Sequence, residues 1–164
     1  MQPSLLMKLA TMTVTRVSEA MSRPVITVPA TETLAAAEHT LRTHRIGGAP
    51  VIGSAGQIVG VISLSDLSGA TSAERAESSV MERTTRMLYG VRVDDPLSLA
   101  LRLMSEQNIH RVLVLDDSAT LVGILTPMDV VRHLLANSGV TQRTDEHLGY
   151  VEITPRAQPP ADSQ

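Results

Sequence analysis

The chain contains one pattern twice, with its two copies 63 residues apart. The segment GVISLSD at 60–66 and the segment GILTPMD at 123–129 both have a glycine, two aliphatic residues, a hydroxyl side chain, two spacers and an aspartate. No insertion or deletion is needed between residues 28 and 67 to keep this spacing. An internal repeat of this length predicts two copies of one supersecondary unit. Matched apolar pairs are Val28 with Val91, Leu34 with Leu97, Ala37 with Ala100, Ile46 with Ile109 and Val51 with Val114.

Upstream, the copies share a Met-x-Arg pattern at 21–23 and 81–83, which are only 60 residues apart, so we expect about three inserted residues before the second copy's first strand. Between the copies, SGATSAERAESSV reads as a linker with a small solvated helix. The end of the chain, TPRAQPPADSQ, has the polar and proline-rich composition of a flexible tail. The expected parts are a lead-in segment at 1–15, the first repeat at 16–72, a linker with the second repeat at 73–140, and the tail at 141–164.

Hydrophobic periodicity changes in the same order within each copy, and it predicts the element order β-α-β-β-α twice, an α/β chain of the α+β type. In the first copy we expect strands at 24–28, 47–52 and 58–63, a helix with Leu34, Ala37 and Leu41 on its apolar face, and a helix from Leu64. In the second copy we expect strands near 87–93 and at 112–115 and 121–125, with helices at 96–107 and 127–137.

Composition argues against several classes of function. A net charge of −3 with two tyrosines, no phenylalanine and no tryptophan gives neither a positive field nor stacking platforms for nucleic acid. There is no cysteine, and the five histidines lack ligand spacing, so we expect no metal site. No apolar run approaches the roughly 20 residues of a membrane helix, and the start is too short for a secretory signal. We therefore expect a cytoplasmic protein with no nucleic-acid or membrane partner.

The repeated pattern places a hydroxyl at the end of a strand and a carboxylate in the first turn of the next helix. We expect Ser63 with Asp66, and Thr126 with Asp129, to project into one cleft. A carboxylate there can accept hydrogen bonds from both hydroxyls of a ribose, and the hydroxyl with free helix N–H groups suits a phosphate. The alternative is a capping box, which only satisfies backbone donors, and Pro127 at the first helical position favours it in the second copy. One residue can serve both purposes.

The segments HRIGGAPVIGSAGQIVGVISLSDL and NIHRVLVLDDSATLVGILTPMDVV, with this order of elements, resemble the CBS domain, named after cystathionine β-synthase. The tandem resembles a CBS pair, or Bateman module, over residues 16–137. The resemblance implies two repeats packed with pseudo-two-fold symmetry and no obligatory cofactor. It also implies a regulatory ligand, AMP, ADP, ATP or S-adenosylmethionine, bound between the repeats and sensed by an effector protein in trans.

The same resemblance implies roles for particular residues. Asp66 and Asp129 would hold ribose, and Ser63 and Thr126 would lie near phosphate. His110 and Arg111 resemble the phosphate-contacting pair of energy-sensing kinase γ subunits, although an exposed strand-end pair is equally expected. The adenine side would fall within Val25–Val28 and Met87–Val91, and Pro50 would line a pocket wall. The residues singled out there are Thr27, Val28, Tyr89 and Val91.

The two copies differ at positions that bear on binding. Gly47 and Gly48 stand where the second copy has His110 and Arg111, and Leu113 stands where the first copy has Pro50. Gly90 likewise replaces Thr27. These differences predict clefts of unequal affinity, without indicating which one binds better.

Two of the expected helices carry more apolar residues than one buried face needs. The extra residues are Leu99 and Leu103 in the first of them and Val130, Val131, Leu134 and Leu135 in the second. Such surfaces favour a homodimer, with burial between the two copies of one chain as the alternative.

Catalysis is not expected, because the repeated carboxylates each stand alone and no nucleophile motif accompanies them. A ligand-sensing module is the favoured function. Its rival is a structural dimerisation or adaptor module with empty or degenerate clefts, and nucleic-acid binding by the outer surface is a weaker third possibility.

Overall fold

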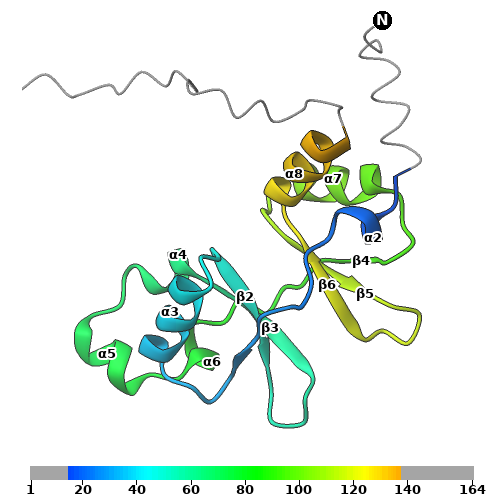
Figure 1. The fold of residues 1–164 in the computed structure, drawn as a ribbon. Coiled ribbons are helices and arrows are strands. Elements are labelled where there is room, and N and C mark those ends of the chain that lie inside the picture. The colour runs from blue at the N-terminus through cyan, green and yellow to red at the C-terminus, as the bar shows by residue number, and fades with distance from the viewer. Residues whose placement is uncertain (1–14, 138–164) are drawn as a thin grey trace, which may run out of the picture.

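The structure of the chain, a computed structural model, describes residues 15–137 as two similar units, each a three-stranded sheet with helices packed against it (Figure 1). The expected α/β class is therefore confirmed. The expected lead-in at 1–15, apart from its last residue, and the expected tail at 141–164 lie outside the described residues.

In the first unit, the central strand pairs with both neighbours. Strand β2 (Gly48–Ile52) runs parallel to β1 (Val28–Pro29) and antiparallel to β3 (Ile58–Ser63). Helix α3 (Leu34–Thr43) begins where the Thr33 side chain accepts a hydrogen bond from the Ala36 N–H at 3.2 Å, and it buries the predicted face of Leu34, Ala37 and Leu41. A short helix, α4 (Leu64–Leu67), follows β3 directly.

The second unit repeats this arrangement. Strand β5 (Val112–Leu115) runs parallel to β4 (Gly90–Arg92) and antiparallel to β6 (Leu121–Leu125). Helices α7 (Leu97–Glu106) and α8 (Pro127–Asn137) complete the unit. The predicted order β-α-β-β-α is thus confirmed in both copies.

Strands β1 and β4 are shorter than expected, and a residue a few positions before each of them pairs with the other unit. Ser22 forms an isolated antiparallel bridge with Ile124 of β6, and Thr85 forms the equivalent bridge with Val61 of β3. Each lead-in segment therefore extends the opposite sheet before its chain enters its own.

The helices that precede the two repeats are exchanged in the same way. Helix α2 (Val17–Ala20) buries Val17 and Ala20 in the core of the second unit, and α6 (Val80–Arg83) buries Val80 in the core of the first. In Figure 1, α2 lies beside α7 and β4, and α6 lies with the first unit. Each core is thus completed by residues from the other half of the chain.

The exchange corrects the expected three-residue insertion. Helices α2 and α6 begin 63 residues apart, at Val17 and Val80, which is also the spacing of the bridged residues Ser22 and Thr85. The Met-x-Arg alignment was wrong because it matched partly exposed residues. The fully buried valines carry the true alignment, since a core position tolerates fewer alternatives.

The expected solvated linker helix is confirmed as α5 (Ser72–Glu77), which has no buried residue. The Arg75 guanidinium fastens it to α3 by an ion pair with the Glu38 carboxylate, and Arg42 binds the same carboxylate at 2.7 Å. The hydrogen bond from Arg42, followed by the positive charge of Arg75, lowers the pKa of Glu38 below its usual value.

Candidate ligand-binding cleft

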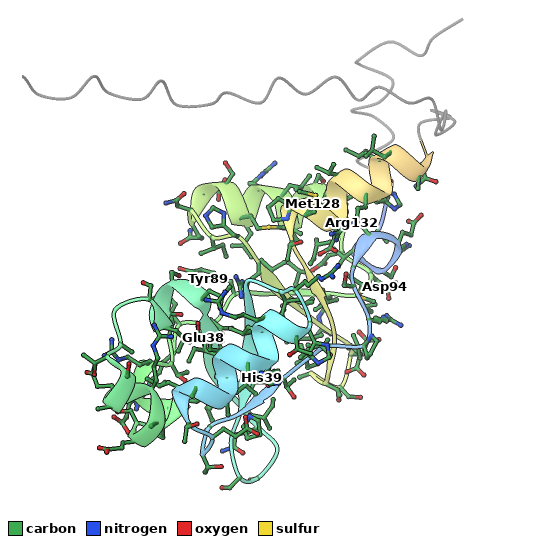
Figure 2. All side chains as sticks on the ribbon, turned by 60° about the vertical axis from the view of Figure 1, so that its left-hand side comes forward. Glu38, His39, Tyr89, Asp94, Met128 and Arg132 are labelled. Carbon is green, nitrogen blue, oxygen red and sulfur yellow. The ribbon has the colours of Figure 1, made fainter. Side chains whose placement is uncertain are left out.

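A cavity of about 540 Å³ lies where the two units face each other. Its walls come from the junction of β3 and α4, from the segment 85–89 before β4, and from the connection between α7 and β5 at 107–111. Tyr89, labelled in Figure 2, belongs to this wall. Both halves of the chain therefore contribute to one cleft. Five of the predicted site residues meet here: Ser63, Asp66, Tyr89, His110 and Arg111.

Asp66 caps helix α4 with one oxygen only. Its Oδ2 accepts a hydrogen bond from the Ser63 backbone N–H at 2.8 Å and another from the Ser63 hydroxyl at 2.6 Å. The capping interpretation therefore holds for this oxygen. Its Oδ1 has no hydrogen-bond partner among residues 15–137, and the side chain is half-buried at the cavity wall. One carboxylate oxygen thus remains available to a hydroxyl donor.

Arg111 brings a cation into the same cavity from the second unit. Its Nη1 is buried and has no hydrogen-bond partner among the described residues. Burial lowers the pKa of the Arg111 guanidinium below its usual value, while the negative charge of Asp66 acts in the opposite direction. The side chain as a whole is half-buried, and no carboxylate among residues 15–137 forms an ion pair with it, so an anionic group at its accessible side would be favoured. His110, beside it, is exposed at the cavity edge.

An apolar surface lies between these polar groups. Met87 is 68% exposed and Leu88 is 37% exposed, although both line the cavity. The Tyr89 hydroxyl is held by the Gln107 side chain at 2.9 Å, which fixes the ring at the edge of this surface. Exposed aliphatic side chains in a concave site are suited to covering the faces of a flat ring.

Thr126 and Asp129 form the equivalent box at the start of α8, outside this cavity. Asp129 Oδ2 accepts from the Thr126 N–H at 2.8 Å and from its hydroxyl at 2.6 Å. Unlike Asp66, however, Asp129 also uses Oδ1, which accepts from the Ser22 hydroxyl at 2.8 Å and from Arg132 at 3.2 Å. The side chain is only 7% exposed.

The other four predicted site residues do not line the cavity. Val28 and Val91 are buried in the two cores, and Pro50 is buried in β2 opposite Val61. Thr27 is exposed before β1. Any contact that Val28, Pro50 or Val91 makes with a ligand would have to run through the backbone.

Sequence reasoning did not single out several residues that do line the cavity: Ser65, Thr85, Gln107 and Asn108. Thr85 could have been found by extending the 63-residue alignment upstream of residue 28, because this alignment pairs Thr85 with Ser22. Gln107 and Asn108 follow the end of α7, and no pattern within one repeat indicates that this end lines a cavity shared with the other unit.

Among residues 15–137, no cluster of three or more His, Asp or Glu side chains is placed to hold a metal ion. No helix in this part is long and apolar enough to cross a membrane.

Two β-α-β-β-α units that exchange their lead-in helices and share a cleft define a tandem α/β repeat protein. The sequence pattern of the CBS domain matches this chain twice, at residues 17–72 and 80–136. The chain belongs to the CBS domain family, which confirms the resemblance noted from the sequence.

Solved structures with the same fold include nucleoside complexes. The CBS domain pair of protein MJ0100, in complex with 5-methylthioadenosine and S-adenosyl-L-methionine, is 30% identical with a TM-score of 0.65, over 73% of this chain and 94% of that one. The CBS domain of a bacterial CNNM/CorC family Mg²⁺ transporter in complex with ATP has a TM-score of 0.71 at 22% identity, over 79% of this chain and 94% of that one. At that identity, the transporter shows the fold alone.

The chain matches most of the length of some curated relatives and only a small part of others. Hypoxic response protein 1 of Mycobacterium tuberculosis is 30% identical over 73% of this chain and 85% of its own length. The L-aspartate semialdehyde sulfurtransferase of Methanocaldococcus jannaschii is also 30% identical, but the match covers only 23% of that protein.

Proposed function

We propose that this chain is a regulatory module that binds an adenosine-containing ligand in the cleft at Asp66 and signals to another protein. One observation carries the proposal: Asp66, which has one carboxylate oxygen unused, and Arg111, which has no ion-pair partner among the described residues, line one cavity beside exposed apolar side chains. The complex of a related CBS pair with S-adenosyl-L-methionine and 5-methylthioadenosine supports this class of ligand.

Each part of the ligand has a matching group in the cleft. Asp66 Oδ1 would accept a hydrogen bond from a ribose hydroxyl, and Met87 with Leu88 would cover the base. Arg111 would pair with a negatively charged phosphate. Its unpartnered guanidinium favours AMP, ADP or ATP over S-adenosylmethionine, whose sulfonium is positively charged.

The position of these groups explains how binding could become a signal. Asp66 belongs to the first unit and Arg111 to the second, so a ligand that contacts both favours the arrangement of the units in which both contacts are good. A ligand shifts a conformational equilibrium by the difference in its affinity for the two states. An effector protein that contacts both units would sense that shift.

The role is regulatory rather than catalytic in this proposal. The carboxylates of Asp66 and Asp129 are engaged as helix caps, and neither lies beside an activated nucleophile. Although some relatives are enzymes, the match to the sulfurtransferase and to the inosine-5'-monophosphate dehydrogenase of Methanocaldococcus jannaschii covers only 23% of each.

We also propose that two copies of the chain associate through α7 and α8. Val130 is buried in the core of its own unit and does not belong to the exposed face. An apolar surface remains on the outside of these helices, at the top of Figure 2 where Met128 is labelled. A face of this kind on a small domain is suited to a second copy of the same face. Its residues and exposed fractions are Leu99 45%, Met128 55%, Val131 45%, Leu134 41% and Leu135 58%.

Thermal melting with AMP, ADP, ATP, S-adenosylmethionine and 5-methylthioadenosine tests ligand binding. A ligand at 100 times its dissociation constant adds about 2.7 kcal/mol, which raises the melting midpoint by several degrees. Asp66→Ala should remove most of this rise, measured from the variant's own ligand-free midpoint. The control Asp117→Ala changes a carboxylate in the distant β5–β6 hairpin, 92% exposed, and should keep the rise. If no compound moves the wild-type midpoint, the adaptor function replaces the sensor.

A further inference from the structure

The equivalent residues Gly48 and Arg111, 63 residues apart, touch each other across the junction of the two units. A Cβ atom at position 48 would overlap the Arg111 guanidinium at Nη1 and would lie 2.6 Å from the Ile62 carbonyl oxygen. Glycine at position 48 is therefore what leaves room for the arginine. Because both positions share one space, only one of them can carry a long side chain.

As a consequence, within residues 15–137 only the cleft at Asp66 has an arginine side chain in its wall. The Arg111 guanidinium lines the cavity that contains Asp66, and the charge of Asp66 acts on it. By the spacing of 63, the residue that corresponds to Arg111 for Asp129 is Gly48, which has no side chain to supply a charge. The nearest charged partner of Asp129 is Arg132, one turn further along α8, and that guanidinium is already bonded to Oδ1 at 3.2 Å.

Asp129 also accepts a hydrogen bond from a hydroxyl group of its own chain, which occupies its second oxygen. The Ser22 hydroxyl donates to Asp129 Oδ1 at 2.8 Å, and the Ser22 backbone is fixed by its bridge to Ile124. With Thr126 on Oδ2, both oxygens of a nearly buried carboxylate are occupied. Thr85 holds the equivalent position in the other cleft, and no hydrogen bond joins it to Asp66 among the described contacts.

We propose that each chain has a single ligand cleft, the one at Asp66, and that Ser22 closes the equivalent cleft by taking the hydrogen-bonding position on Asp129 that a sugar hydroxyl would need. This inference rests on the proposed function. It adds that each chain has one binding site, and that Ser22 is the residue that prevents binding at the second. A ligand entering at Asp129 would have to displace Ser22 and would meet Gly48 where the other cleft offers an arginine.

Titration calorimetry with ATP counts the sites, with AMP as a second probe. The wild-type chain should bind one nucleotide per chain. Asp66→Asn should weaken binding at least about tenfold, since a hydrogen bond to a charged group is lost, whereas the matched Asp129→Asn should change the dissociation constant by less than about twofold. Two sites per chain, or equal losses in the two variants, would overturn the inference while leaving the proposed function in place.

Closure by Ser22 can be tested without any ligand, so it is decided even if no nucleotide binds and the proposed function fails. Urea denaturation measures how Ser22→Ala, Asp129→Asn and the double variant change the unfolding equilibrium constant. The effect of the double variant should differ from the combined effects of the two single variants by up to about tenfold. The matched cycle of Thr85→Ala and Asp66→Asn should be additive. Additivity in the first cycle, or the same coupling in both, would show that Ser22 does not distinguish the clefts.

Discussion

Asp66 and Asp129 have the same local sequence pattern and the same capping hydrogen bonds, yet they differ in one oxygen. In both, Oδ2 receives the hydroxyl and backbone N–H of the preceding Ser or Thr. Only Asp129 Oδ1 is taken by other side chains. The capping interpretation and the binding hypothesis therefore apply to different atoms of one residue, and a single side chain of Asp66 can serve both.

The buried charge of Arg111 yields a prediction at the same scale. Replacing it in Arg111→Met removes an unsatisfied cation while keeping apolar volume, so the ligand-free protein should be as stable as the wild type or more stable. Nucleotide affinity should fall at least about tenfold, since a charge-assisted contact is lost. Thermal melting and titration calorimetry with ATP measure the two effects.

The exposed Arg102 provides the control for this substitution, because Arg102→Met removes an arginine from α7 away from the cavity. It should leave ATP affinity unchanged. If Arg111→Met instead lowered the ligand-free midpoint and left affinity intact, Arg111 would be a structural residue.

At the scale of elements, the strongest patterns were predicted with the right bounds and the exchanged ones were not. Strands β3, β5 and β6 and helix α8 agree with expectation, because each is a continuous apolar or amphipathic run between turn residues. Helices α2 and α6 have only four residues each, and what they bury lies in the other unit. Periodicity within one repeat does not contain that information.

The outer face of α8 gives the prediction for association. Val131 and Leu134 are three residues apart on this helix and both are exposed. The double variant Val131→Glu with Leu134→Glu should turn a dimer into a monomer, because charges on a buried apolar face are costly to desolvate. Analytical ultracentrifugation measures the mass. Ala35→Glu, on the exposed side of α3 in the other unit, should leave the dimer intact.

A wild-type chain that sediments as a monomer at micromolar concentration would contradict the dimer directly. A double variant that still dimerises would instead move the interface away from this face of α8.

At the scale of the whole molecule, neither repeat forms the cleft alone, because residues from both halves of the chain line it. The repeat, the order of elements and five of the cavity residues could be predicted, since they follow from local patterns and from the resemblance. The contact of Gly48 with Arg111 and the place of Gln107 in the cavity wall could not, because they depend on how the units pack.

Nuclear magnetic resonance of the backbone amides during ATP titration tests the central claim most directly, because it locates the ligand on both units at once. We predict the largest shifts at 63–66, 85–89 and 107–111, with little change at 22–26 and 126–129. Shifts confined to one unit, shifts centred on Asp129, or no shifts with any of the adenosine compounds would contradict a ligand bound between the repeats at Asp66.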